Sequence, residues 1–263
     1  MLEYIVEMFS YPFMQRAFLV GILVSLCASL LGVSLVLKRY SMIGDGLSHV
    51  GFGALAVASA LNMAPLAVAV PVVILAAFIL LRLSDNGRLK GDAAIAMIST
   101  GALAVGVMVV SVTTGMNSDL NSYMFGSILA MSKSDVVLSV VLSVIVLVLY
   151  LLFYDKIFAV TFDAVFARAT GIRTGLYNML LAVLTSVTVV LGMRMMGALL
   201  ISSLIIFPAL TAMRVCKRYR SVILCAVAVS VVSFILGMTV SFLLATPAGA
   251  SIVIVDIVLY FIF

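Results

Sequence analysis

Charged residues are scarce in this 263-residue chain: Asp, Glu, Lys and Arg together make up 10% of it, while 65% is hydrophobic. A soluble domain carries about a quarter of charged residues, so the composition excludes an ordinary soluble fold. Apolar runs of about 20 residues recur along the sequence, and that length crosses the hydrocarbon core of a bilayer. We therefore predict an all-α bundle of transmembrane helices, inserted in a membrane and surrounded by lipid.

Cysteine is sparse as well, and the phosphate-binding motif of P-loop ATPases is missing. Cys27, Cys216 and Cys225 show no Cys-x-x-Cys spacing and lie in or beside apolar segments, which favours packing roles over a disulfide framework. No Gly-x-x-x-x-Gly-Lys-Ser/Thr sequence occurs, so the chain is not expected to bind ATP through a P-loop. The chain is predicted not to be an enzyme and to hold no permanent cofactor.

Nine apolar segments within a single domain, residues 1–263, are predicted to span the membrane, although the second and ninth are the weakest. They are 16–37, 41–60, 64–82, 92–114, 134–154, 174–193, 196–214, 221–244 and 249–262. With the N-terminus outside and the C-terminus inside, all but three of the 15 lysines and arginines face the cytoplasm; the exceptions are Arg16, Lys133 and Arg194. Short loops follow the positive-inside rule, which favours this orientation with eight or nine spans. The net charge of +5 is then a topology signal, and nucleic-acid binding is not expected.

The only histidine, His49, follows Asp45 by four residues in the sequence SMIGDGLSHVGFG, 41–53. Residues four apart on a helix share one face. A carboxylate and an imidazole both bind divalent transition metals. An ionisable side chain inside a membrane is energetically costly, so its presence there suggests a function. The pair predicts a metal site, and the alternative is a hydrogen bond that ties two helices together. Gly44 and Gly46 weaken the helix around Asp45, which favours local opening there.

A short helix outside the membrane is predicted between residues 161 and 171. Asp163 suits the N-cap position of this helix and Gly171 suits its end. Phe162 and Phe166, one turn apart, give it an apolar face. A helix this short needs something to pack on, which is either the membrane surface or a partner protein.

Two further groups of side chains have more than one interpretation. Asp256, in the last apolar segment, is expected to pair with an arginine or to lie at the surface, and a metal ligand or relay is the other interpretation. Met193, Met195 and Met196 are soft ligands that suit copper(I). Core packing is the favoured interpretation of these methionines.

Five sequence segments together resemble the membrane permease of zinc- and manganese-uptake ABC transporters. They are GDGLSHV at 44–50, YMFGSIL at 123–129, FDAVFARATG at 162–171, GALLISSLIIFPA at 197–209 and TPAGASIV at 246–253. The resemblance implies a homodimeric, multi-pass permease in a bacterial cytoplasmic membrane. It also implies separate ATP-binding-cassette ATPase subunits, which bind the ATP, and an extracytoplasmic metal-binding protein.

By the same resemblance, Asp45 and His49 hold the transported ion, with Zn²⁺ favoured and Mn²⁺ next. The helix at 161–171 then docks on the ATPase, through Phe162, Asp163, Phe166, Arg168 and Gly171. Ala164 and Val165 stand where many relatives carry proline or glutamate. The alternative function is a self-sufficient secondary carrier of a divalent cation, which would usually need more intramembrane carboxylates than Asp45 and Asp256.

Overall fold

The computed structural model describes residues 9–85, 91–113, 126, 132–198 and 201–263, and most of these are helical. The helices are α2 (Pro12–Leu37), α3 (Ile43–Ala60), α4 (Pro65–Asp85), α5 (Gly91–Thr113), α7 (Lys133–Leu152), α8 (Tyr154–Phe162), α9 (Ala164–Ala169), α10 (Thr174–Met196), α11 (Ile201–Val215), α12 (Tyr219–Leu244) and α13 (Ala248–Ile262). The prediction of an all-α bundle is confirmed.

Six helices are long and apolar enough to cross a membrane: α2, α4, α5, α7, α10 and α12. Helices α11 and α13 are apolar but shorter, with 15 residues each. Helix α3 has 18 residues, but Asp45, His49 and its glycines lower its hydropathy. Within the described residues, a helix therefore lies at every predicted segment, and six of these helices meet the length and hydropathy that a span requires.

The seventh apolar segment begins later than its predicted start. The prediction began it at residue 196, whereas α10 continues to Met196 and α11 begins at Ile201. Gly197 ends α10 with a φ of 89°, a conformation that side-chain-bearing residues rarely adopt.

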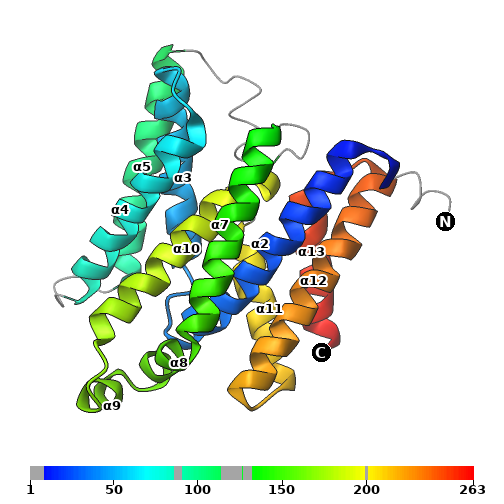
Figure 1. Ribbon diagram of the computed structural model, residues 1–263. Coiled ribbons are helices and arrows are strands. Elements are labelled where there is room, and N and C mark those ends of the chain that lie inside the picture. The colour runs from blue at the N-terminus through cyan, green and yellow to red at the C-terminus, as the bar shows by residue number, and fades with distance from the viewer. Residues whose placement is uncertain (1–8, 86–90, 114–125, 127–131, 199–200) are drawn as a thin grey trace.

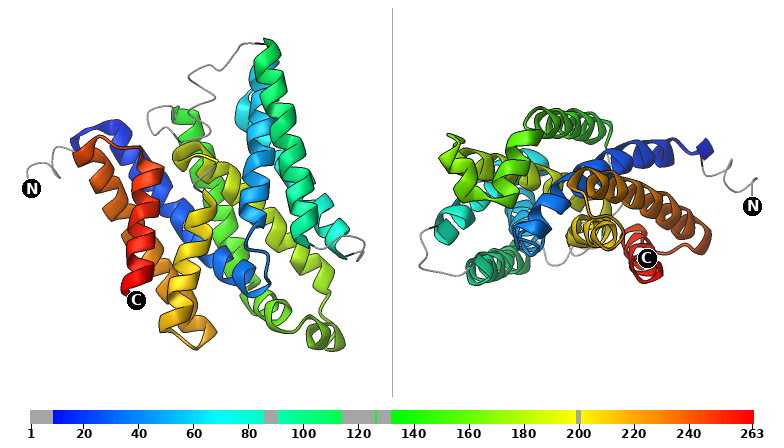
Figure 2. Two further views of the ribbon diagram at one scale, coloured as in Figure 1. Left: turned by 180° about the vertical axis from the view of Figure 1, so that it is seen from behind. Right: turned by 90° about the horizontal axis from the view of Figure 1, so that it is seen from below.

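Helix α2 lies in the middle of one group of helices. Figure 1 shows α2 between α7 and α12, and the view from behind in Figure 2 shows α11 and α13 on its other side. Small side chains on α2, among them Ser25, Ala28 and Ser29, are fully buried. They let neighbouring helices approach closely, which matters in lipid, where apolar burial alone does not drive helices together. Helices α3, α4 and α5 form a second group, joined to the first mainly through α10.

The chain reverses direction between α2 and α3, and this turn is held by Lys38. The Lys38 ammonium donates to the carbonyl oxygen of Val160 in α8 at 3.1 Å and to Oδ1 of Asn178 in α10 at 2.7 Å. Figure 1 shows that α3 begins above the lowest turns of α8 and α9, at the end of the bundle that also holds the C-terminus. The end of α2, from which the chain turns toward α3, is thus connected to α8 and α10 through one lysine.

The stretch between α7 and α10 contains one more helix than predicted. Residues 154–162 form α8, and Asp163 then takes an extended conformation with φ −146° and ψ 95° before α9 begins. Phe162 is the last residue of α8, whereas Phe166 lies in α9. The prediction that they share one helical face is wrong, because the N-cap residue between them interrupts the helix.

Candidate metal site

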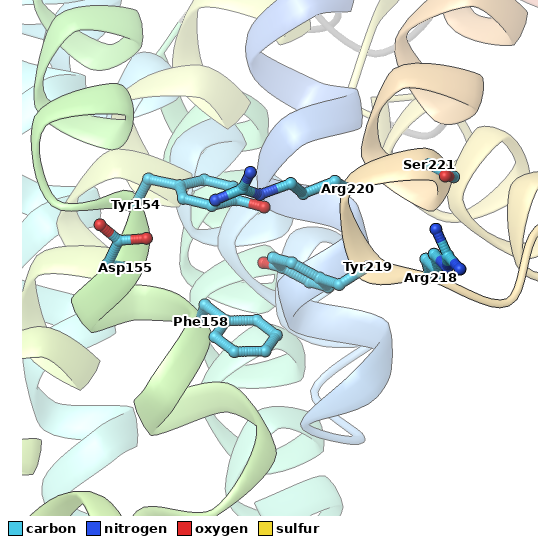
Figure 3. Close-up of a pocket in the computed structure, with 7 residues that line it drawn as sticks. All are labelled: Tyr154, Asp155, Phe158, Arg218, Tyr219, Arg220 and Ser221. Atoms are coloured by element: carbon cyan, nitrogen blue, oxygen red, sulfur yellow. The ribbon is translucent and has the colours of Figure 1, made fainter.

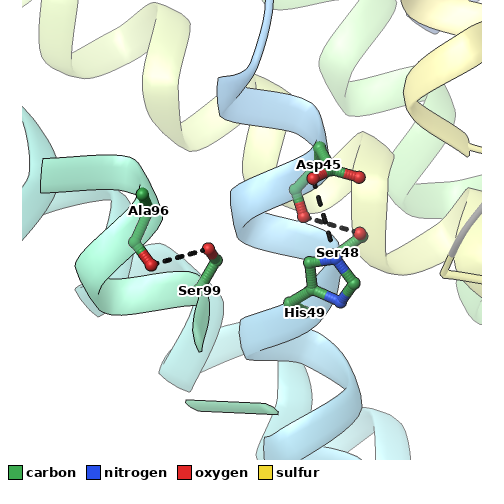
Figure 4. A network of polar contacts seen from close by, with 5 residues as sticks. All are labelled: Asp45, Ser48, His49, Ala96 and Ser99. Carbon is green, nitrogen blue, oxygen red and sulfur yellow. Dashed lines mark hydrogen bonds and ion pairs between the residues drawn. The ribbon is translucent and has the colours of Figure 1, made fainter. Parts of the chain in front are cut away.

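Asp45 and His49 face each other on the first two turns of α3. Nε2 of His49 lies 3.6 Å from Oδ2 of Asp45 (Figure 4). The His49 side chain is 18% exposed and the Asp45 side chain is 33% exposed. The predicted spacing on one helical face is confirmed. Both side chains line a cavity of about 330 Å³ between α3 and α5.

The wall opposite the pair is provided by α5. Ile95, Ala96, Ser99, Thr100 and Leu103 line it, and Met42 closes the cavity from the turn before α3. The sequence did not reveal these residues, because nothing in their spacing indicates which helix packs against α3.

The hydroxyl groups of Ser48 and Ser99, near the pair, donate their protons within their own helices. Ser48 donates to the carbonyl oxygen of Asp45 at 2.7 Å, and Ser99 donates to that of Ala96 at 3.1 Å (Figure 4). Within the described residues, neither the Asp45 carboxylate nor the His49 ring makes a hydrogen bond, and at 3.6 Å their mutual contact is an ion-pair distance. Their lone pairs are therefore available to a cation that enters the cavity.

Helix α3 is continuous through Gly44 and Gly46, so the local opening suggested by these glycines is not seen. A Cβ atom at position 46 would lie 2.5 Å from Cγ2 of Ile95. Gly46 therefore allows α3 to approach α5 closely, and this approach forms the narrow side of the cavity. The glycine has a packing role.

No group of three or more His, Cys, Asp or Glu side chains suited to a metal occurs in the described part of the chain. One chain thus offers two side-chain ligands, which suits an ion that must be released again more than an ion held permanently. Met193 and Met196 are buried in the core, as expected for packing residues. The side chain of Met195 lies outside the described residues.

The last apolar segment carries a buried carboxylate. Asp256 in α13 has no exposed surface, and neither of its oxygen atoms has a hydrogen-bond partner among the described residues. The nearby Arg214 donates instead to the carbonyl oxygen of Tyr260 at 2.9 Å and lies over the Tyr260 ring. Both favoured interpretations of Asp256, an arginine pair and a surface position, are wrong.

The segment predicted to dock on a partner has a well-defined helical cap. Oδ1 of Asp163 accepts hydrogen bonds from the backbone N–H groups of Val165 at 2.9 Å and Phe166 at 2.8 Å. Gly171 has a φ of 85° just after α9, so the predicted beginning and end of this helix are confirmed. Arg168 donates to Oγ1 of Thr174 at 3.3 Å, which connects α9 to the start of α10.

The apolar side chains of this segment differ in their surroundings. The Phe162 ring packs on Tyr219 with 5.6 Å between ring centroids, whereas Phe166 is 66% exposed. Val165 beside it is 82% exposed. The outward apolar surface of α9 therefore consists of Val165 and Phe166.

A comparison with known protein families shows to which family the chain belongs. The model of the ABC 3 transport family matches residues 10–263. The chain belongs to the ABC 3 transport family. It is accordingly a multi-pass membrane permease subunit of a bacterial ABC transporter and not the ATPase, in agreement with the missing P-loop motif.

Individual members of the family are similar over nearly their full length. The chain is 31% identical over 244 residues to the high-affinity zinc uptake system membrane protein ZnuB of Haemophilus influenzae, covering 93% of this chain and 94% of that protein. It is 28% identical over 260 residues to the manganese import system permease protein ScaB of Streptococcus gordonii, covering 99% and 93%. Among solved structures, PsaBC from Streptococcus pneumoniae in complex with Fab matches with a TM-score of 0.89 and 28% identity, covering 99% of this chain and 94% of that one.

Proposed function

We propose that this chain is the permease of an importer for a divalent transition metal, and that Asp45 and His49 bind the ion during its passage. The observation that carries the proposal is the position of the only histidine of the chain, 3.6 Å from a carboxylate in a shared cavity. The zinc and manganese systems named among its relatives agree with such an ion.

Zinc is our first choice of substrate and manganese our second. Imidazole nitrogen and carboxylate oxygen suit Zn²⁺ at about 2.0–2.2 Å. Mn²⁺ accepts the same ligands but prefers more oxygen. Beyond the Asp45 carboxylate, the side chains that line the cavity supply only the hydroxyl oxygens of Ser99 and Thr100 and no second carboxylate.

A second copy of the chain completes the site in this proposal. The cavity adjoins the outer face of α5: Ala96 and Thr100 line it and are exposed, and Val107, further along the same stripe of the helix, is 50% exposed. The Asp45 carboxylate, which is 33% exposed, would be costly if it faced lipid. A homodimer that covers this face of α5 would enclose the pathway in protein and bring a second Asp–His pair toward the ion.

We assign α9 to contact with an ATP-binding-cassette ATPase subunit in the cytoplasm. Val165 and Phe166 are exposed there on a helix whose cap and end are well defined. This assignment has the nine helices at the predicted segments crossing the membrane, with the N-terminus outside and the C-terminus inside. The opposite end then receives the ion from an extracytoplasmic metal-binding protein.

Lys38 connects the two functional regions in this proposal. Movement of α9 and α8 under the ATPase is transmitted through the Val160 carbonyl to Lys38, and from there through the turn 38–42 to the start of α3. Asp45 and His49 lie on the first two turns of α3. Alternating access then follows from a rigid shift of α3 against α5.

The proposal is tested by metal uptake into proteoliposomes that contain the chain, its ATPase and its metal-binding protein. The transported ions are radiolabelled zinc and manganese. We expect ATP-dependent uptake in the wild type and none with His49→Ala. Ser99→Ala is the matched control, since Ser99 lines the same cavity but donates to its own helix. Normal uptake by His49→Ala would refute the site, and uptake without ATP would favour the secondary carrier.

A further inference from the structure

A second cavity, of about 400 Å³, lies between α8 and the start of α12, remote in sequence from the metal pair (Figure 3). Three aromatic side chains line it: Tyr154, Phe158 and Tyr219. Two arginines, Arg218 and Arg220, and the carboxylate of Asp155 supply its charge, and Ser221 completes the lining.

The aromatic wall is held rigidly in place. The Tyr219 hydroxyl lies 3.0 Å from Oγ of Ser34 and 3.3 Å from the Tyr150 hydroxyl, and both partners are buried. The Phe158 and Tyr219 rings pack with centroids 4.8 Å apart. The cavity is therefore formed before any ligand binds, which lowers the entropic cost of binding.

The charge of the cavity is that of an anion site. Two guanidinium groups and one carboxylate leave a net charge of +1, which matches one phosphodiester. Neither Arg218 nor Arg220 has an ion pair within 4.0 Å in the described part of the chain, and both are exposed. Lys217 adds a further positive charge in the same loop.

The cavity also lies at the boundary between polar and apolar surface. Leu224 follows Arg220 by one turn on the same face of α12 and is 70% exposed. Leu151, at the end of α7 just before Tyr154, is 64% exposed. A ligand bound by the arginines would therefore find uncovered apolar surface directly toward the membrane.

We propose that this cavity binds the head group of an anionic phospholipid, with the phosphodiester between Arg218 and Arg220 and an acyl chain along Leu224. Basic residues at the end of a transmembrane helix attract anionic head groups. Arginine forms paired hydrogen bonds with phosphate oxygens. Neither argument depends on which metal the permease carries, so the lipid site and the metal site can be tested separately.

The test uses the purified chain in neutral detergent, with bound lipid counted by native mass spectrometry during titration with phosphatidylglycerol or phosphatidylcholine. We expect one tightly bound phosphatidylglycerol and at least tenfold weaker binding of phosphatidylcholine. The double variant Arg218→Gln/Arg220→Gln should lose at least tenfold in affinity for phosphatidylglycerol. Arg173→Gln is the matched control, since Arg173 is exposed but lines a different cavity, and it should change the affinity less than twofold.

Three results would overturn the proposal. The first is equal binding of the two lipids, and the second is unchanged phosphatidylglycerol affinity in the double variant although it elutes as a folded protein. The third is complete competition by 10-fold molar excess of inorganic phosphate over the lipid, which would identify a site for a free anion.

Discussion

The connection through Lys38 yields the sharpest prediction about coupling. Replacing Lys38 by methionine keeps most of the side-chain length but removes both hydrogen bonds, to the Val160 carbonyl and to Asn178. A buried hydrogen bond from a charged donor stabilises by about 1.5–3 kcal/mol. Because Lys38 is only half-buried, we expect about 2 kcal/mol for both bonds together, which corresponds to about thirtyfold in an equilibrium constant.

We therefore expect ATP-driven metal uptake by Lys38→Met to fall by up to about thirtyfold. The ATPase should still copurify with this variant, since Val165 and Phe166 on α9 are unchanged. Proteoliposome uptake and copurification measure the two effects separately. Arg39→Met is the matched control: it removes one charge from the same turn, and the Arg39 side chain makes no hydrogen bond or ion pair in the described part of the chain.

Uptake by Lys38→Met within twofold of the wild type would refute the connection. An equal loss in Arg39→Met would also refute it, because the effect would then come from charge in the turn and not from the two hydrogen bonds. If Lys38→Met lost both ATPase copurification and metal uptake, Lys38 would only maintain the shape of α8.

Three more outcomes follow from individual side chains. Phe166→Asp should abolish copurification of the ATPase without changing the elution volume of the permease, since Phe166 is 66% exposed; unchanged copurification would contradict the docking role. Asp163→Ala should destabilise α9 by about 1 kcal/mol and weaken ATPase binding, whereas Asp163→Asn, which can still cap, should bind normally. Asp256→Val, close in size, should raise the melting temperature in detergent, because a buried polar group without partners costs about 1–3 kcal/mol; a lower melting temperature would show that the carboxylate has a partner in solution.

The metal pair was predictable because its signal is local. One carboxylate and the only histidine of an apolar chain stand four residues apart, and helical geometry alone places them on one face. The wall formed by Ser99 and Thr100 was not predictable, since it depends on how α5 packs against α3. The contact of Lys38 with Val160 joins residues 122 positions apart and left no pattern in the sequence.

The helix break after Phe162 is a feature that the sequence could have predicted. Asp163 was correctly predicted as an N-cap, and an N-cap residue has a non-helical backbone conformation. Phe162, which precedes the cap, therefore cannot continue the face of Phe166 on the same helix. Helix α8 was missed because Asp155 and Lys156 interrupt the apolar pattern near its start. The burial of Asp256 could not be read from sequence, because a carboxylate without partners contradicts the general rule for buried charges.

The most direct test of the metal site is X-ray absorption spectroscopy of the purified chain loaded with zinc, in parallel with manganese and ferrous iron. The protein should carry an affinity tag without histidine, because His49 is then the only source of imidazole scattering. We predict a nitrogen or oxygen shell near 2.0–2.1 Å with imidazole outer-shell scattering, lost in His49→Gln. Bound metal without imidazole scattering in the wild type would contradict the account.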